Sequence, residues 1–305
     1  MTAGKKSLTE APINLKEAID WVLRVSGRDS DKENEEGKKA IKGLAEELTA
    51  SIRKKPYEEN DDVKKILTEI MYDANISPTG PVIRLAYALQ KFIGYEWAKG
   101  NPNYKWKIGE NGILKTGDLP NAYTSDYRGS KLSEVLSTVE DVHKKALESF
   151  FTAIAFIYEG LTELYFKCNT EWSKQSLSGS GHSDTLNQFM TTNGFGKTQL
   201  NSNMTGANIA DNALKDLSEL SSAYSAAGDN PSLETFRSQL EQNASTDPSK
   251  SPLAALYILA TYVYVQSTSP ATPSFAGYSG LAALGGGAYG LNLGGLGNFV
   301  SALLA

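Results

Sequence analysis

The sequence predicts an all-α fold, an irregular multi-helix bundle with long surface loops and a Gly-rich C-terminal tail. Apolar residues recur at helical spacing in most segments between residues 14 and 265. Capping residues, glycines and prolines mark the ends of several of these segments. A hydrophobic content of 40% in 305 residues is enough for a real core. We expect one helical domain over residues 8–268, after a flexible N-terminus at 1–7 and before a tail at 269–305.

The first helix has the clearest signals. Asn14 can cap it, and Glu17 three residues later completes a capping box. Gly27 can adopt the left-handed conformation that ends a helix. The apolar stripe between them is Leu15, Ala18, Ile19, Val22 and Leu23.

Three further helices are expected before residue 95. The apolar spacing predicts helices over residues 38–53 and 61–72. Pro81 suits the first position of the next helix, and Gly94 is its stop.

The second half of the chain predicts a long central helix and several shorter ones. Residues 131–168 form the longest helical pattern, with one break near Glu148 as an option, and its second half is apolar almost all round. Such a helix is expected to be buried. Shorter helices are predicted over 184–190, 209–224, from Pro231 onward, and over 253–265.

Two long segments, 95–129 and 169–206, are predicted as surface loops. The first is rich in Gly, Asn, Tyr and Trp and has no helical period. Glu110-Asn111-Gly112 could form a hairpin turn between residues 106–108 and 113–114. Because the segment is long for a plain connection, we expect it to be either functional or mobile.

The sequence offers no visible catalytic, cofactor or metal signature. The two histidines, His143 and His182, lie far apart, and Cys168 is predicted to be a small buried hydrophobe near a helix end. The run 194–198, Gly-Phe-Gly-Lys-Thr, lacks both the earlier glycine and the preceding strand of a phosphate loop. We therefore predict no catalytic residue, no cofactor and no metal.

An aromatic cluster is the strongest candidate for partner binding. Large rigid aromatics with polar tips dominate protein-binding hot spots, but they also pack loops onto a helical core. Both interpretations stay open. The candidate partner-binding residues are Tyr95, Trp97, Tyr104, Trp106, Tyr123 and Tyr127.

The charge balance and the ends of the chain limit the function class. A net charge of -5 argues against a general nucleic-acid binder, so no nucleic-acid partner is expected. The polar N-terminus does not resemble a secretory signal. The tripeptides that begin at Asn75, Asn203 and Asn243 match the glycosylation pattern, and whether they are used stays open.

Residues 8–27, LTEAPINLKEAIDWVLRVSG, resemble the N-terminal motif of the variant erythrocyte surface antigens of Babesia-type blood parasites. Residues 89–95, LQKFIGY, and 252–257, PLAALY, resemble later segments of that family and occur in the expected order. The resemblance therefore frames residues 8 to about 265.

The resemblance implies export to the surface of the infected erythrocyte, antigenic variation, immune evasion and adhesion to host endothelium. It also implies two kinds of protein partner, a host endothelial receptor and a second family subunit. It brings no catalytic role. Longer family members carry a cysteine-rich region and a membrane span, whereas this chain has one cysteine and an uncharged end. Residues 281–305 fit a poor hydrophobic span, the discarded tail of a lipid-anchor signal, or a disordered end, so membrane association stays open.

Two alternatives belong to other function classes. One is an intracellular helical scaffold or interaction protein in the parasite cytoplasm. The other is an enzyme of unrecognised type that would use Asp, Glu and Tyr side chains.

Overall fold

The computed structural model describes residues 6–28, 79–97, 106–118, 125–127, 140–179, 185–248 and 250–267. Of these residues 59% are helical and 7% lie in strands, so the fold is mostly α-helical. The predicted helices over 38–53 and 61–72, most of the N-terminal segment 1–7 and the tail 269–305 lie outside the described residues.

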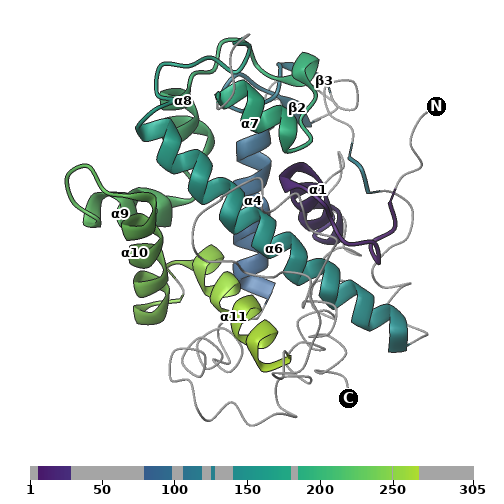
Figure 1. Ribbon diagram of the computed structural model, residues 1–305. Helices are drawn as coiled ribbons and strands as arrows, with labels where there is room; N and C mark the ends of the chain where they lie inside the picture. Colours follow the sequence, from purple (N-terminus) through teal and green to yellow (C-terminus); the bar gives the residue numbers. More distant parts are fainter. Residues whose placement is uncertain are drawn as a thin grey trace.

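Helix α6 (Glu140–Asn169) runs through the middle of the molecule, and α1 (Leu15–Val25) crosses it (Figure 1). The two helices approach closely because α6 carries Gly160 where Leu15 packs; a Cβ at Gly160 would lie 2.9 Å from a Leu15 methyl carbon. Trp21 of α1 packs against Phe150 of α6, with ring centroids 6.1 Å apart. α6 continues without interruption past Glu148, and its second half is largely buried, as its apolar composition predicts.

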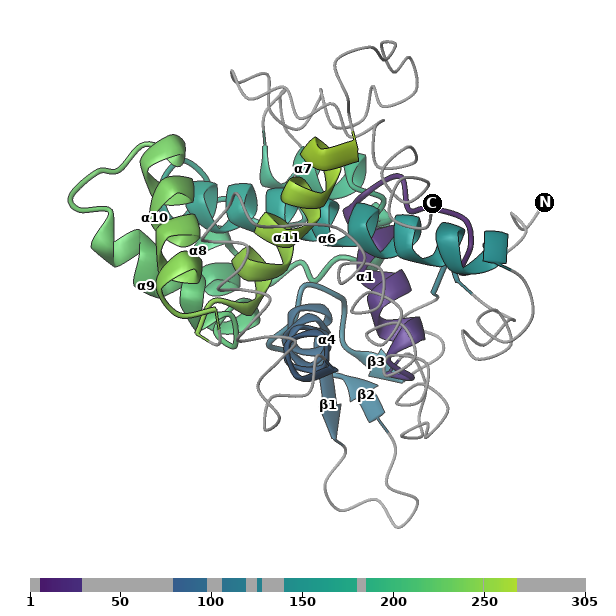
Figure 2. The same ribbon diagram turned by 90° about the horizontal axis from the view of Figure 1, so that it is seen from below.

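The remaining helices pack around this pair. α4 (Thr79–Ile93) lies beside α1 and α11 (Pro252–Ser267), and α11 also contacts α6. α9 (Ser218–Ala226) and α10 (Leu233–Thr246) pair at one end of α6 (Figure 2). There Tyr165, Tyr224 and Phe236 form an aromatic cluster with ring centroids 5.7–6.0 Å apart.

Several predicted ends of helices are confirmed. The Asn14 side chain accepts a hydrogen bond from the Glu17 backbone N–H at 2.9 Å, which satisfies a free donor of the first turn. Gly27 and Gly94 have φ of 68° and 112°, the left-handed conformation that ends α1 and α4. Glu17 reaches back to the N–H of Ile13, one residue before the cap that the capping box predicts.

The expected helix over 209–224 is corrected by the structure. Short helix α8 (Gly206–Asn208) continues into the π-helix η3 (Ile209–Ala213), and a non-helical residue, Leu217, precedes α9. The Leu214 N–H donates to the Ile209 carbonyl at 2.9 Å, a wider turn than that of an α-helix.

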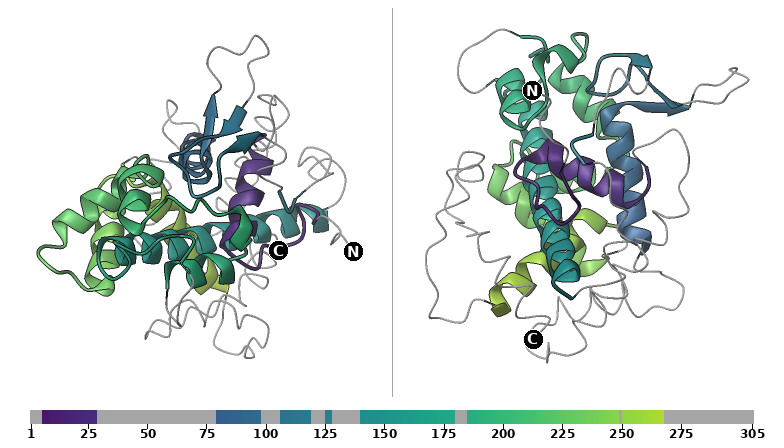
Figure 3. Two further views of the ribbon diagram at one scale, coloured as in Figure 1. Left: turned by 90° about the horizontal axis from the view of Figure 1, so that it is seen from above. Right: turned by 90° about the vertical axis from the view of Figure 1, so that its right-hand side faces the viewer.

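Segment 95–129 contains a small sheet and is not a plain loop. Strands β1 (Tyr95–Trp97), β2 (Trp106–Ile108) and β3 (Gly117–Asp118) form an antiparallel sheet in the order β1-β2-β3, next to the end of α4 (Figure 3). The hairpin expected between 106–108 and 113–114 is wrong, because β2 pairs with β3 instead. Ile113 and Leu114 donate their backbone N–H groups to the last carbonyls of α4, at 2.9 and 3.2 Å.

Segment 169–206 is more ordered than a surface loop as well. Helix α7 (Leu186–Thr192) lies close to the predicted short helix over 184–190, and Thr185 caps it. A short 3-10 helix, η2 (Lys197–Gln199), follows. The run 194–198 thus comes after a helix, whereas a phosphate loop requires a preceding strand.

Candidate functional site

Two of the six candidate aromatic residues belong to the core. Tyr95 and Tyr127 are 2% and 0% exposed. The Tyr127 hydroxyl donates to the Glu10 backbone carbonyl at 2.8 Å, so this ring holds the N-terminal segment in place. For these two residues the packing interpretation is correct, because neither ring is accessible to a partner.

The other four aromatic residues do not complete a described cluster. The backbones of Trp97 and Trp106 are register partners in the β1–β2 pair. Tyr104 and Tyr123 lie outside the described residues. The structure therefore brings only the Trp97 and Trp106 backbones together.

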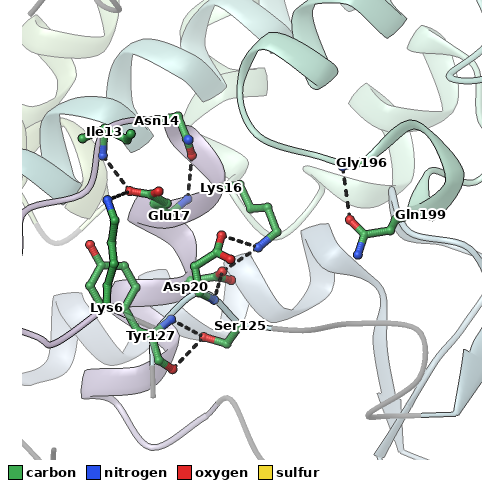
Figure 4. A network of polar contacts seen from close by, with 11 residues as sticks. Lys6, Ile13, Asn14, Lys16, Glu17, Asp20, Ser125, Tyr127, Gly196 and Gln199 are labelled. Atoms are coloured by element: carbon green, nitrogen blue, oxygen red, sulfur yellow. Dashed lines mark hydrogen bonds and ion pairs between the residues drawn. The ribbon is translucent and has the colours of Figure 1, made fainter. Parts of the chain in front are cut away.

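Three buried charged residues of α1 form a network with two partly exposed residues from other segments. We call this network the α1 clamp: Lys6, Lys16, Glu17, Asp20 and Asp126 (Figure 4). The Lys16 ammonium lies 2.7 Å from Asp20 Oδ2 and 2.8 Å from Asp126 Oδ2. Asp20 Oδ2 also accepts the Asp126 backbone N–H at 2.8 Å. Lys16 and Asp20 are 4% and 0% exposed, although lysine and aspartate side chains usually lie at the protein surface.

The clamp joins segments that are far apart in the sequence. Glu17 pairs with Lys6, and the Trp21 indole N–H donates to the Leu8 carbonyl at 3.0 Å, so residues 6–10 are held against α1. Asp20 and Lys16 hold residues 125–127 on the same helix. The backbone N–H of Lys16 donates to the Asn193 carbonyl at 3.1 Å, which adds the segment after α7.

Burial controls the protonation of this network. Desolvation raises the pKa of Asp20 to about 7, although the positive charge of Lys16 opposes that shift. Desolvation also acts on Lys16, but its two carboxylate partners outweigh it and raise the Lys16 pKa. The network therefore holds ionisable side chains inside the fold, where they form ion pairs and hydrogen bonds with one another.

A second buried carboxyl, Glu219 of α9, holds the start of α11. Its Oε1 accepts the Leu253 backbone N–H at 3.2 Å, one of the free donors at a helix N-terminus. Glu219 is 4% exposed, and desolvation raises its pKa to about 8. This contact joins the α9–α10 pair to α11.

An exposed surface is built where two predicted loops meet. We call residues 109–116 and 196–203 the joined loops. Leu114 and Leu200 form an antiparallel bridge, the Lys115 N–H donates to the Gln199 carbonyl at 2.7 Å, and the Asn201 N–H donates to the Ile113 carbonyl at 2.9 Å. The Asn201 side chain also donates to the carbonyls of Glu110 and Gly112, at 3.1 and 3.3 Å.

The joined loops place exposed polar side chains on a fixed backbone. Gly112 allows residues 109–116 to lie close to the end of α4, because a Cβ at this position would lie 2.1 Å from the Gly94 Cα. Backbone hydrogen bonds on both sides leave the side chains free to face solvent. The exposed residues are Glu110, Asn111, Lys115, Thr116, Gly196, Lys197, Thr198, Ser202 and Asn203.

Sequence reasoning missed both the clamp and the joined loops. Asp20 lies four residues after Lys16, but nothing local indicates its other partner, Asp126, 106 positions away. The pairing of Leu114 with Leu200 is also non-local. The glycine pair Gly94 and Gly112 was an available signal, since close backbone approach is a common reason for glycine.

Cys168 is fully buried, as predicted, and desolvation raises its pKa to about 12. In the part of the chain that the structure describes, no group of three or more His, Cys, Asp and Glu side chains could hold a metal ion. Within the same ranges no helix combines the length and the apolar character that crossing a bilayer requires. No protein-family model, no curated protein and no solved structure matches this chain.

Proposed function

We propose that this chain is a variant surface antigen of infected erythrocytes that mediates cytoadhesion and antigenic variation. The observation that carries the proposal is the joined loops, a set of exposed polar side chains held on a hydrogen-bonded backbone. Loops on a rigid scaffold are the usual place for recognition and for sequence change, because substitutions there leave the core intact.

The resemblance of residues 8–27 to the antigen family supports the same proposal. Those residues include α1 and the three clamp residues that are buried and paired, Lys16, Glu17 and Asp20. In this proposal the helices form an irregular bundle with long surface loops. The bundle is the constant base, and the exposed side chains vary.

The proposed partners are a host endothelial receptor and a second family subunit. The proposed location is the surface of the infected erythrocyte, with attachment to the host-cell membrane through residues 269–305. Surface staining of infected cells that express a tagged full-length chain tests the location. Staining of intact cells is expected; staining only after permeabilisation would contradict the proposal and favour an intracellular scaffold in the parasite cytoplasm.

Adhesion tests the site separately. Lys115→Glu and Lys197→Glu reverse two exposed charges of the joined loops and leave the backbone pairing intact. We expect each variant to weaken adhesion of infected cells to an endothelial monolayer several-fold, because a reversed charge at an interface opposes association. Lys250→Glu, an exposed lysine between α10 and α11, is the matched control and should adhere normally. Equal adhesion by all three variants would exclude the joined loops as the adhesion site.

A further inference from the structure

Helix α4 carries an exposed stripe that the α1 clamp and the joined loops do not use. Arg84, Tyr87 and Lys91 are spaced three and four residues apart, so they share one face of the helix. Tyr87 is 45% exposed and the Lys91 side chain is 62% exposed. Among the described residues, only Tyr87 and Ile13 are large hydrophobic side chains with this much exposure.

Arg28, just beyond the end of α1, is held over this stripe. Its guanidinium carbon lies 3.3 Å from the centroid of the Tyr87 ring, and its Nη1 lies 3.4 Å from Gln90 Oε1. The Gln90 amide donates in turn to the Arg28 backbone carbonyl at 2.9 Å. Gln90 is 4% exposed, so a buried side chain fixes both the backbone and the head group of Arg28.

Within the described residues, the positive charges of Arg28 and Lys91 have little compensation. No carboxylate within the described ranges forms an ion pair with Arg28. Lys91 has Asp216 at 3.5 Å, but both side chains are largely exposed, and such pairs are weak. Arg28 therefore keeps N–H donors in a fixed plane beside an exposed aromatic ring.

We propose that this face, formed by Arg28, Tyr87 and Lys91, is a docking site for an acidic segment of a protein partner. A planar guanidinium matches the two oxygens of a carboxylate, and stacking on Tyr87 fixes its orientation before the partner arrives. The apolar ring of Tyr87 contacts the stem of the acidic side chain, and Lys91 attracts a second carboxylate one helical turn away.

The chemistry of the face favours an acidic peptide over a nucleic acid. A single-stranded nucleic acid requires successive aromatic platforms for its bases, whereas this face presents one ring. The chain is acidic as a whole, so its positive surface is local. The inference does not rest on the proposed function, since it applies wherever the folded chain is located.

The test uses the purified full chain and fluorescent synthetic peptides graded in Asp and Glu content, measured by polarisation. We expect affinity to rise with acidic content and to fall with added salt. Tyr87→Ala and Lys91→Glu should each weaken binding about tenfold, the equivalent of about 1.4 kcal/mol. Arg28→Lys keeps the charge and loses the planar fork, so a similar loss would identify the guanidinium as the recognition group.

Lys174→Glu, an exposed lysine in the turn after α6, is the matched control. Thermal melts of each variant separate a loss of binding from a loss of folding, and Lys91 is exposed enough for its variant to fold. Acidic peptides that fail to bind, that bind Lys174→Glu as weakly as the Tyr87 variant, or that bind less tightly than a heparin oligosaccharide or an oligonucleotide would each overturn the proposal.

Discussion

Asp20 is a fully buried carboxyl whose two oxygens have different surroundings. Oδ2 accepts hydrogen bonds from Lys16 and from the Asp126 backbone, while Oδ1 has no hydrogen-bond partner among the described residues. A buried charge with one engaged oxygen depends strongly on its remaining partners. Lys16 is therefore more important for folding than an ordinary lysine on a helix.

Lys16→Met should lower the free energy of unfolding by about 3–5 kcal/mol, because it leaves Asp20 buried without its counter-charge. Urea unfolding followed by circular dichroism measures the loss. The double variant Lys16→Met, Asp20→Leu is the control: it should be less destabilised than Lys16→Met alone, because it removes the unpaired charge as well. Additive losses would show that the two side chains act independently.

The two raised carboxyl pKa values predict a pH dependence of stability. Asp20 is raised from 3.8 to about 7 and Glu219 from 4.5 to about 8, so the folded chain binds these protons more tightly than the unfolded chain does. Their effect on the free energy of unfolding is therefore to lower it as pH rises from about 4 through about 8. Urea midpoints measured across this window should fall toward alkaline pH.

Glu219→Gln tests the share of one group. The neutral amide keeps an oxygen for the Leu253 N–H, so stability near neutral pH should be retained and its decline at higher pH should be shallower. The same series of urea midpoints measures this slope. A slope equal to that of the unaltered chain would mean that Glu219 is not the group that titrates.

At the scale of residues, local signals were predictable and distant partners were not. Asn14 begins a helix, and Gly27 and Gly94 end helices, for reasons contained in a few neighbouring positions. Asp20 and Asp126 meet only because the chain folds back between them, and no local pattern contains that information.

At the scale of elements, one of the joined loops, residues 109–116, packs closely against the end of α4. Gly112→Ala would place a Cβ 2.1 Å from the Gly94 Cα and 2.4 Å from the Ile93 carbonyl oxygen. We expect a loss of about 1–3 kcal/mol and faster amide hydrogen exchange at Lys115 and Asn201. Gly196→Ala, whose nearest atom is the flexible end of Gln199, is the control within the same loops and should cost little. Unchanged exchange in Gly112→Ala would mean that the close packing at Gly112 does not hold the joined loops together.

Elements with a strong periodic pattern were predicted well, and those with short pairings were not. The described part of α6 confirms the long central helix, α4 and α11 begin and end near their expected bounds, and α10 begins near Pro231. β3 has two residues, too few to show an alternation of apolar and polar side chains. Leu214, Leu217 and Leu220 keep a helical spacing across the interruption between η3 and α9, which is why the helix over 209–224 was predicted without a break.

At the scale of the whole molecule, α1 connects the N-terminal segment and residues 125–127 to the central helix α6. It packs against α6 and α4 and holds residues 6–10 and 125–127. A chain that begins at residue 29 should therefore lose its fixed packing, visible as a weak near-UV circular dichroism signal. A synthetic peptide covering residues 6–28 should restore that signal when added, whereas a version with Trp21→Ala should not. A native spectrum without any peptide would show that α1 is not required for the fixed packing of the other helices.

The mostly α-helical class followed from composition and periodicity, since most of the core is made of helix stripes. The arrangement of those helices did not follow, because it is set by single close contacts such as Gly160 with Leu15. The candidate aromatic site was predicted from residue type alone. Residue type does not separate a ring that packs inward from one that faces solvent.

The burial of α1 has a consequence for immune recognition. Ten of its eleven residues are buried, so an antibody raised against this stretch as a free peptide would meet its epitope only in unfolded protein. Such a serum would react on a denaturing blot and fail to label the native chain. Antibodies to residues 15–25 would thus be useful for detecting the denatured chain and unsuitable for binding it in its folded state.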